Sequence, residues 1–284
     1  MTIESQSKLN RASLNWRISA YILMFAFALL TLFPLLWLFY SSLKPHAEIM
    51  RHPLGLPQHP SFANYVRAWT MGNLGTALMN SFIYTITATI ATLFLALAAA
   101  FGISKLPSKS SGFFTGAFAV GLMLTVHAVI IPLFLVEVKV GIINRRIGVI
   151  LPYIAFDLPM SVMIAISYIR GIPDALIESA EIDGAKYRAI FWQLIIPLST
   201  PVIATMVILS FLSHWNEFLF VFVFTTKAVL KSLPVAITQF AGRYNTEFGL
   251  QYASLVIGIF PMIIFYIFFH TKLIEGFGEG ALKE

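Results

Sequence analysis

The sequence contains no cysteine, and charged residues make up only 11% of its 284 positions. The absence of cysteine excludes disulfide bonds and thiolate metal sites. The sequence also lacks the G-x-x-x-x-G-K-[ST] pattern of a phosphate-binding loop, the H-E-x-x-H pattern of zinc proteases and the G-x-S-x-G pattern of hydrolase nucleophiles. We therefore expect no catalysis and no metal site in this chain, and no cofactor bound by it.

Apolar residues are abundant instead: they make up 58% of the chain, and the mean hydropathy is +0.82. Each segment that is nearly free of charge is long enough for the ~20 residues that a membrane-spanning helix needs. The sequence thus predicts an all-α, polytopic membrane protein with six transmembrane helices in the lipid bilayer. The net charge of +6 is spread over loops and gives no reason to expect nucleic acid as a partner. The six segments are 18–43, 68–104, 110–136, 147–169, 189–216 and 248–271.

The six segments divide the chain into an N-terminal segment, transmembrane helices, connecting loops and a C-terminal tail. The first apolar run exceeds the ~7–15 residues of a signal-peptide core, so we expect an uncleaved first span. An even number of spans places both termini on one side. Lysine and arginine divide ten against nine between the two sides, so the positive-inside rule does not decide which side that is. The predicted parts are an N-terminal segment 1–16, a first transmembrane helix 17–42, a loop 43–77, a core of five transmembrane helices 78–273 that contains a polar loop 171–201, and a tail 274–284.

The polar loop predicts a helix, a turn and a second helix at a membrane surface. Pro173 suits the first turn of a helix, and Asp174 places negative charge at its positive end. An apolar stripe should face inward while the acidic residues face water. Gly184 suits a turn with positive φ, and Pro197 and Pro201 should interrupt the second helix, which resumes at residues 185–194. The expected stripe is formed by Leu176, Ile177, Ala180 and Ile182.

The residue spacing in this loop resembles the "EAA" loop of permease subunits of bacterial binding-protein-dependent ABC importers. Glu178, Ser179 and Ala180 are followed by Gly184 after three residues, and Leu194 and Pro197 come at the expected distance beyond it. Ser179 stands where the family usually has alanine. The resemblance implies a cytoplasmic coupling loop whose short helix sits in a groove of a separate ATP-hydrolysing subunit. The implied ATPase-coupling residues are Glu178, Ser179, Ala180, Asp183, Gly184, Leu194 and Pro197.

Two further segments, WNEF at 215–218 and SLPVAITQF at 232–240, resemble the carbohydrate branch of these permeases, typified by the smaller maltose-transporter permease. The resemblance implies that the chain forms half of a translocation pathway for a sugar, oligosaccharide or related polyol. It also implies a heterodimer with a second homologous permease subunit, a dimer of ATP-binding ABC subunits carrying ATP and Mg²⁺, and an extracytoplasmic solute-binding protein. The implied location is the bacterial cytoplasmic (inner) membrane, with both termini cytoplasmic.

Ionisable and polar groups inside the predicted spans are candidates for the pathway, because such groups are costly at mid-bilayer. Asp157 lies between two prolines, and it could instead be a hydrogen-bonded carboxyl that satisfies backbone freed by Pro159. Ser210, His214 and Glu217 share one helical face at offsets of four and three, with Asn216 beside it. That face could instead form hydrogen bonds between subunits.

Other functions are compatible with the same residues. A self-sufficient secondary transporter would use Asp157, His214 and Glu217 as a proton relay. This reading is weakened because the sequence shows no pair of interrupted helices in matching halves. An import permease for amino acids or metals is a further alternative, disfavoured by the two carbohydrate-branch segments.

Overall fold

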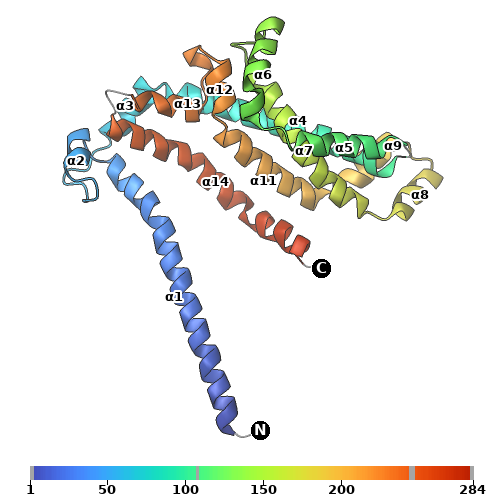
Figure 1. The fold of residues 1–284 in the computed structure, drawn as a ribbon, viewed down its shortest axis with the longest axis horizontal. Helices are drawn as coiled ribbons and strands as arrows, with labels where there is room; N and C mark the ends of the chain where they lie inside the picture. Colours follow the sequence, from blue (N-terminus) through green and yellow to red (C-terminus); the bar gives the residue numbers. More distant parts are fainter. Residues whose placement is uncertain (1–2, 107–108, 243–246, 282–284) are drawn as a thin grey trace. The chain divides into compact units, whose positions relative to one another are not determined.

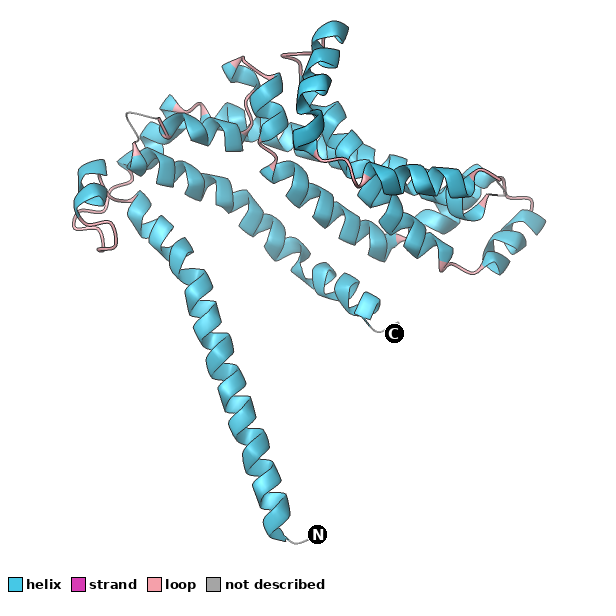
Figure 2. Cartoon of the chain, viewed as in Figure 1, coloured by secondary structure: helices cyan, strands magenta, loops and turns pink. Residues whose placement is uncertain are grey.

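The computed structural model describes residues 3–106, 109–242 and 247–281, with side chains from residue 16 to residue 269 outside the same two gaps. Every element in these ranges is helical (Figure 2). Within the described residues, four helices are long and apolar enough to cross a membrane, or up to six if each of two bent helix pairs counts as one span. The predicted all-α, polytopic membrane fold is therefore confirmed. Residues 1–2 of the predicted N-terminal segment and residues 282–284 of the predicted tail lie outside the described ranges.

The chain forms two units, of which the first comprises Met1–Gly72 and Phe240–Ile257. It contains α1 (Ile3–Ser42), α2 (His46–Arg51), α3 (Ala63–Met71) and the beginning of α14 (Phe248–Ala281). The helix α1 begins well before the first apolar run, and its most apolar stretch is exposed throughout. A face of that kind suits contact with lipid or with another membrane helix.

The loop after α1 is fixed by hydrogen bonds to its own unit. The Asn64 side chain donates to the carbonyls of Ser42 and Lys44, both at 2.8 Å. Gly249 of α14 lies so close to Asn64 that an added Cβ would meet the amide nitrogen at 2.8 Å. The predicted loop 43–77 thus contains the two short helices α2 and α3, and side chains hold its backbone.

The second unit comprises Asn73–Gln239 and Gly258–Glu284. Its centre is formed by α4 (Leu74–Lys105), α7 (Arg146–Arg170) and α11 (Thr200–Asn216), which pack against one another (Figure 1). Small residues at the contacts allow these helices to approach closely, as is usual between membrane helices. The row of hydroxyl residues on α4 is buried in this bundle. The shared core includes Ala96, Ala100, Val162, Ala165, Ile166 and Met206, and the hydroxyl row is Ser81, Thr85, Thr89 and Thr92.

The third predicted span is not one straight helix. It is divided into α5 (Ser111–Gly121) and α6 (Val126–Val140), which are bent by 100°. Thr125, before α6, has an extended backbone, and Gly121, at the end of α5, packs on Pro159, whose Cγ would lie 3.0 Å from an added Cβ. The residues between the two helices are all apolar or hydroxyl-bearing, so hydropathy alone predicted a continuous span.

The fifth predicted segment, 189–216, ends at the same residue as α11. After α11, the backbone of Glu217 is extended, and a separate helix α12 (Leu219–Phe224) begins. The carboxylate of Glu217 accepts a 2.8 Å hydrogen bond from the Phe220 N–H, so it serves as a helix cap. Asn216 and Glu217 interrupt the apolar sequence at this break, and the apolar residues that follow form α12.

The segment after α12 runs through η2 (Ala228–Leu230), α13 (Leu233–Ile237) and η3 (Thr238–Phe240), and its first part is held against α4. Asn80 donates to the Val229 carbonyl at 2.7 Å, and Tyr84 donates to the Leu230 carbonyl at 2.8 Å. Side chains of α4 therefore satisfy a stretch of backbone that has few partners of its own.

Candidate functional site

The polar loop forms the predicted helix at its start, α8 (Asp174–Ile182). Pro173 lies one position before the helix rather than inside its first turn. Ile177 is the buried residue of α8, whereas Ile182, expected on the same inward stripe, is 85% exposed. Ile182 is five residues after Ile177, which places it about 140° around the helix from the buried face. Its side chain therefore points away from the core.

The turn after α8 is closed by main-chain hydrogen bonds. Gly184 has a φ of +82°, its N–H donates to Glu181 O, and the Ala185 N–H donates to Ala180 O, each at 2.9 Å. This is the Schellman arrangement, in which a glycine with positive φ ends the helix and satisfies its last carbonyls. The predicted turn at Gly184 is present in the structure.

The second helix of the loop differs from the prediction. It runs through α9 (Tyr187–Ile190), a π-helical turn η1 (Phe191–Ile195) and α10 (Ile196–Leu198), so Pro197 lies inside it. The Ile196 N–H donates to Phe191 O, five residues back, and this wider turn accommodates a proline that has no N–H to donate. The helix breaks instead at Ser199, and Pro201 lies in the first turn of α11.

The predicted coupling residues fall into two groups. Glu178, Ser179 and Asp183 are exposed on α8 and its cap, as is Pro197. Ala180 and Leu194 are partly buried and pack against the bundle core. The loop thus has one side fixed to the transmembrane helices and one side open to a partner.

A lysine that the sequence analysis did not select anchors the start of α8. Lys105, the last residue of α4, donates from Nζ to Ile172 O and to Asp174 Oδ1, both at 2.6 Å. Only 4% of its side chain is exposed, whereas 76% of the Asp174 side chain is. A lysine at the end of an apolar helix carries no sequence signal that distinguishes it from an interfacial residue.

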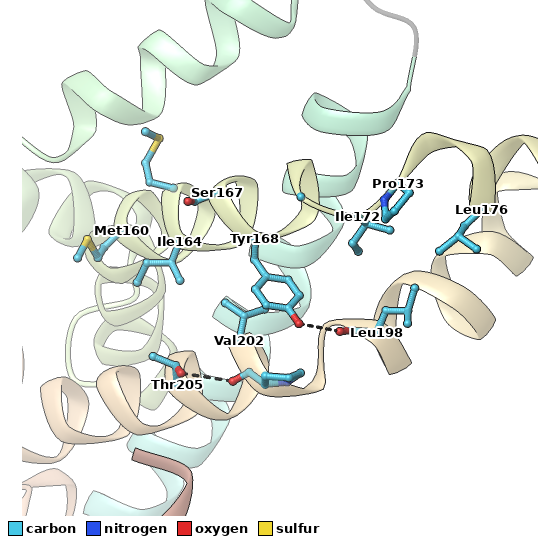
Figure 3. Close-up of a pocket in the computed structure, with 13 residues that line it drawn as sticks. Met160, Ile164, Ser167, Tyr168, Ile172, Pro173, Leu176, Leu198, Val202 and Thr205 are labelled. Carbon is cyan, nitrogen blue, oxygen red and sulfur yellow. Dashed lines mark hydrogen bonds between the residues drawn. The ribbon is translucent and has the colours of Figure 1, made fainter. Parts of the chain in front are cut away.

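A cavity of about 800 Å³ lies beside this loop (Figure 3). Its walls come from the second half of α7, the segment before α8 and the region around the α10–α11 bend. Tyr168 crosses from α7 and donates to the Leu198 carbonyl at 3.1 Å (Figure 3). The lining is mostly apolar with a few hydroxyl groups, among them those of Ser167, Tyr168 and Thr205.

Within the bundle, the structure brings together three of the predicted pathway residues. Ser210 Oγ donates to Asp157 Oδ2 at 2.5 Å, and His214 Nε2 lies 3.6 Å from the same oxygen. His214 also contacts Thr89 Oγ1 through Nδ1 at 3.1 Å, and its ring stacks on Tyr153. Ser210 and His214 are buried, and 13% of the Asp157 side chain is exposed. The hydrogen-bond partners of Ser210 and His214 that the structure describes lie within this chain.

Of the other two predicted residues, Asn216 lies apart from this cluster, whereas the half-buried Glu217 interacts with Tyr153, on which the His214 ring stacks. Asn216 is exposed and donates to the Leu212 carbonyl of its own helix at 2.8 Å. Glu217 caps α12. Thr89, which belongs to the buried hydroxyl row of α4, is a partner of His214 that was not among the predicted pathway residues. Among the side chains that the structure describes, no group of three or more His, Asp or Glu residues is placed to hold a metal ion.

Comparison with known proteins identifies the family. Residues 92–273 match the family model described as "Binding-protein-dependent transport system inner membrane component". The chain belongs to this family of transport components. The matched region includes the polar loop, the residues that line the cavity, and Asp157, Ser210 and His214 of the buried cluster.

Curated relatives align over nearly the whole chain. The probable ABC transporter permease protein YurM of Bacillus subtilis is 31% identical over 99% of this chain and 93% of its own. The diacetylchitobiose uptake system permease protein NgcG of Streptomyces coelicolor is 30% identical over 93% and 88%. The permease fold is therefore shared from end to end rather than over one segment.

A solved structure has the same fold. A crystal structure of a bacterial ABC transporter involved in the import of the acidic polysaccharide alginate matches with a TM-score of 0.81 over 92% of this chain and 97% of that chain. The sequence identity is 23%. The broken helices of the second unit are thus part of a fold that a permease of known structure also adopts.

Proposed function

We propose that this permease imports a carbohydrate, either a sugar, an oligosaccharide or a related polyol, as one half of the translocation pathway of an ATP-driven importer. Relatives along the whole chain are named for the uptake of diacetylchitobiose, of multiple sugars and of arabinooligosaccharides. The segments 215–218 and 232–240, which resemble the carbohydrate branch, agree with those names. The observation that carries the proposal is the family match over residues 92–273, with its coupling-loop spacing present on an exposed helix and turn.

The energy source is proposed to be a dimer of separate ATP-binding ABC subunits. The chain has no phosphate-binding loop of its own, so ATP and Mg²⁺ would be bound by those subunits. The exposed side of α8, with Glu178, Ser179 and Asp183, would dock there, and Gly184 would hold the turn in shape. Movement of the loop as a rigid body would then open and close the pathway between helices.

A second homologous permease and an extracytoplasmic solute-binding protein complete the proposed importer. A likeness in fold to an alginate transporter solved in complex with alginate pentasaccharide-bound periplasmic protein supports the latter. Pairing with a second permease would cover apolar surface of the kind seen on α1. The proposed location is the bacterial cytoplasmic membrane, with both termini and the coupling loop on the cytoplasmic side.

We propose a smaller set of pathway residues than the five that the sequence predicted. Asp157, Ser210 and His214 form one buried cluster, whereas Asn216 bonds to the backbone of its own helix, and Glu217 caps α12 and interacts with Tyr153 beside the cluster. We propose that the cluster holds α7 against α11 beside the pathway, and that Asp157, the partly exposed member, is the one positioned to meet substrate.

Affinity purification of the tagged chain from its native membrane in mild detergent tests this proposal, with co-purifying polypeptides identified by mass spectrometry. We expect an ABC ATPase and a second permease, each in stoichiometric amount. A chain that purifies alone or as a homo-oligomer, and that transports a solute in liposomes without ATP, would instead support the secondary transporter.

A further inference from the structure

The ammonium group of Lys105 links the end of α4 to the segment between α7 and α8 and to α8 itself; we call this contact the α4–α8 joint. Lys105 Nζ bonds Ile172 O, in the short segment between α7 and α8, and Asp174 Oδ1, on the first residue of α8. Ile172 itself is buried in the bundle core. A single side chain from the end of α4 therefore connects to the segment that enters α8 and to α8 itself.

The helix α8 has few other ties to the bundle. Of its nine residues, Ile177 is the buried one, and most of the others are exposed. No side chain caps the α8 N-terminus, because Pro173 occupies the cap position. The contact at Asp174 is therefore the polar attachment of α8 at the end where it leaves the bundle.

The two hydrogen bonds of Lys105 differ in how far they are exposed to water. The ion pair with Asp174 is weakened by water, since Asp174 is mostly exposed. The bond to the Ile172 carbonyl is shielded, because the lysine is buried, and removing the ammonium would leave a carbonyl without this donor. Together, the two bonds of Lys105 fix the orientation of α8 relative to α4 more than they add to the stability of the fold.

We propose that Lys105 is a positioning residue that makes the end of α4 and the beginning of α8 move as one body. Displacement of α8 would then reach α4, and through α4 the bundle that it shares with α7 and α11. This inference rests on the proposed function, in which α8 is moved by an ATPase. Without the Lys105 contact, α8 could swing about Ile172 and Pro173 while the bundle stayed still.

The first test compares Lys105→Met with Lys105→Arg, Asp174→Asn and the control Lys109→Met, all in the assembled importer in liposomes. Lys109 is an exposed lysine four positions further on. We expect sugar imported per ATP hydrolysed to fall at least fivefold in Lys105→Met and two- to fivefold in Asp174→Asn, with the amount of bound ATPase subunit unchanged. Lys105→Arg should restore most of the ratio, and Lys109→Met should match the parent. A parental ratio in both Lys105→Met and Asp174→Asn would overturn the proposal.

The second test uses the absence of native cysteine. A variant with Lys105→Cys and Asp174→Cys carries two thiols, which a short bifunctional thiol reagent can link. We expect the unlinked variant to transport poorly per ATP and the linked variant to recover at least half of the parental ratio, since the link replaces the joint. Linking that abolishes transport would show that α4 and α8 must separate, which contradicts the proposal.

These outcomes are distinct from failure of the proposed function. If the parent chain recruits no ATPase and shows no ATP-dependent uptake, the importer assignment fails. If the parent is an active importer and the linked variant does not recover, only the role of Lys105 fails.

Discussion

Ser210 Oγ donates a 2.5 Å hydrogen bond to Asp157 Oδ2, and this contact joins α11 to α7 inside the membrane bundle. His214 lies one turn beyond Ser210 and 3.6 Å from the same carboxylate oxygen. The bond therefore forms part of a shared polar junction in an apolar setting, where an unsatisfied polar group is expensive. Substitutions of its members should not act independently of one another.

Ser210→Ala should lower the free energy of unfolding by about 1–3 kcal/mol, because Asp157 loses a donor in a largely buried site. The same substitution in an Asp157→Asn background should cost clearly less, since the two residues share one interaction. Detergent-induced unfolding followed by tryptophan fluorescence would measure both. Asn216→Ala is the control, expected within about 0.5 kcal/mol of the parent because its bond is exposed and local. Strictly additive losses would show that the bond has no energetic role.

Gly184→Val should strain the turn after α8, since Gly184 has a φ of +82° and a β-branched residue is rarely found there. We expect uptake to fall at least tenfold while the amount of protein in the membrane stays normal, because the change lies outside the bundle. Gly112→Ala is a matched control, with negative φ and open space around an added Cβ. Unchanged uptake with Gly184→Val would remove the turn from the coupling mechanism.

Gly148→Ala should destabilise the start of α7. An added Cβ would lie 2.6 Å from Ile142 O and 2.9 Å from Glu137 Oε2, and the first of these is backbone that cannot rotate away. We expect a loss of about 1–3 kcal/mol, typical of overpacking. The comparison is Gly102→Ala in α4, where the space around an added Cβ is open and alanine favours the helix. Equal stability of the two variants would contradict this packing argument.

Asn80→Ala should loosen the segment 228–232. Asn80 donates to the carbonyls of Val229 and Lys231, at 2.7 and 3.1 Å, and accepts a bond from Arg146 at 3.2 Å. Amide hydrogen exchange in that segment should accelerate at least tenfold, because the segment depends on α4 for its partners. Tyr84→Phe, which removes one bond, should give a smaller increase. Exchange that is the same in both variants and the parent would mean that packing alone holds the segment.

Hydropathy predicted the helical class and the long spans α4 and α7, and the conformational freedom of glycine predicted the turn at Gly184. Hydropathy did not predict the bend in the third span, because the residues on both sides of Thr125 are apolar. The bend is accompanied by the packing of Gly121 on Pro159, which is a tertiary contact, whereas the Glu217–Phe220 bond at the start of α12 is local. A hydropathy pattern averaged over a window of the sequence carries no information about such tertiary contacts.

Only part of the candidate site was predicted, because the other part also depends on contacts between residues that are distant in the sequence. The offsets along α11 correctly grouped Ser210 with His214, but helix spacing does not say that α11 ends before Glu217. Lys105 was missed because its partners are 67 and 69 residues away in the chain. Contacts at that separation follow from the fold rather than from local spacing.

Uptake of labelled sugar into proteoliposomes tests the central claim most directly. The chain would be reconstituted alone or with its co-purified permease, ATPase and binding protein, with and without ATP inside the vesicles. We predict uptake only with the complete set and internal ATP, and no effect of an uncoupler. Uptake by the chain alone that an uncoupler abolishes and ATP does not change would contradict the account.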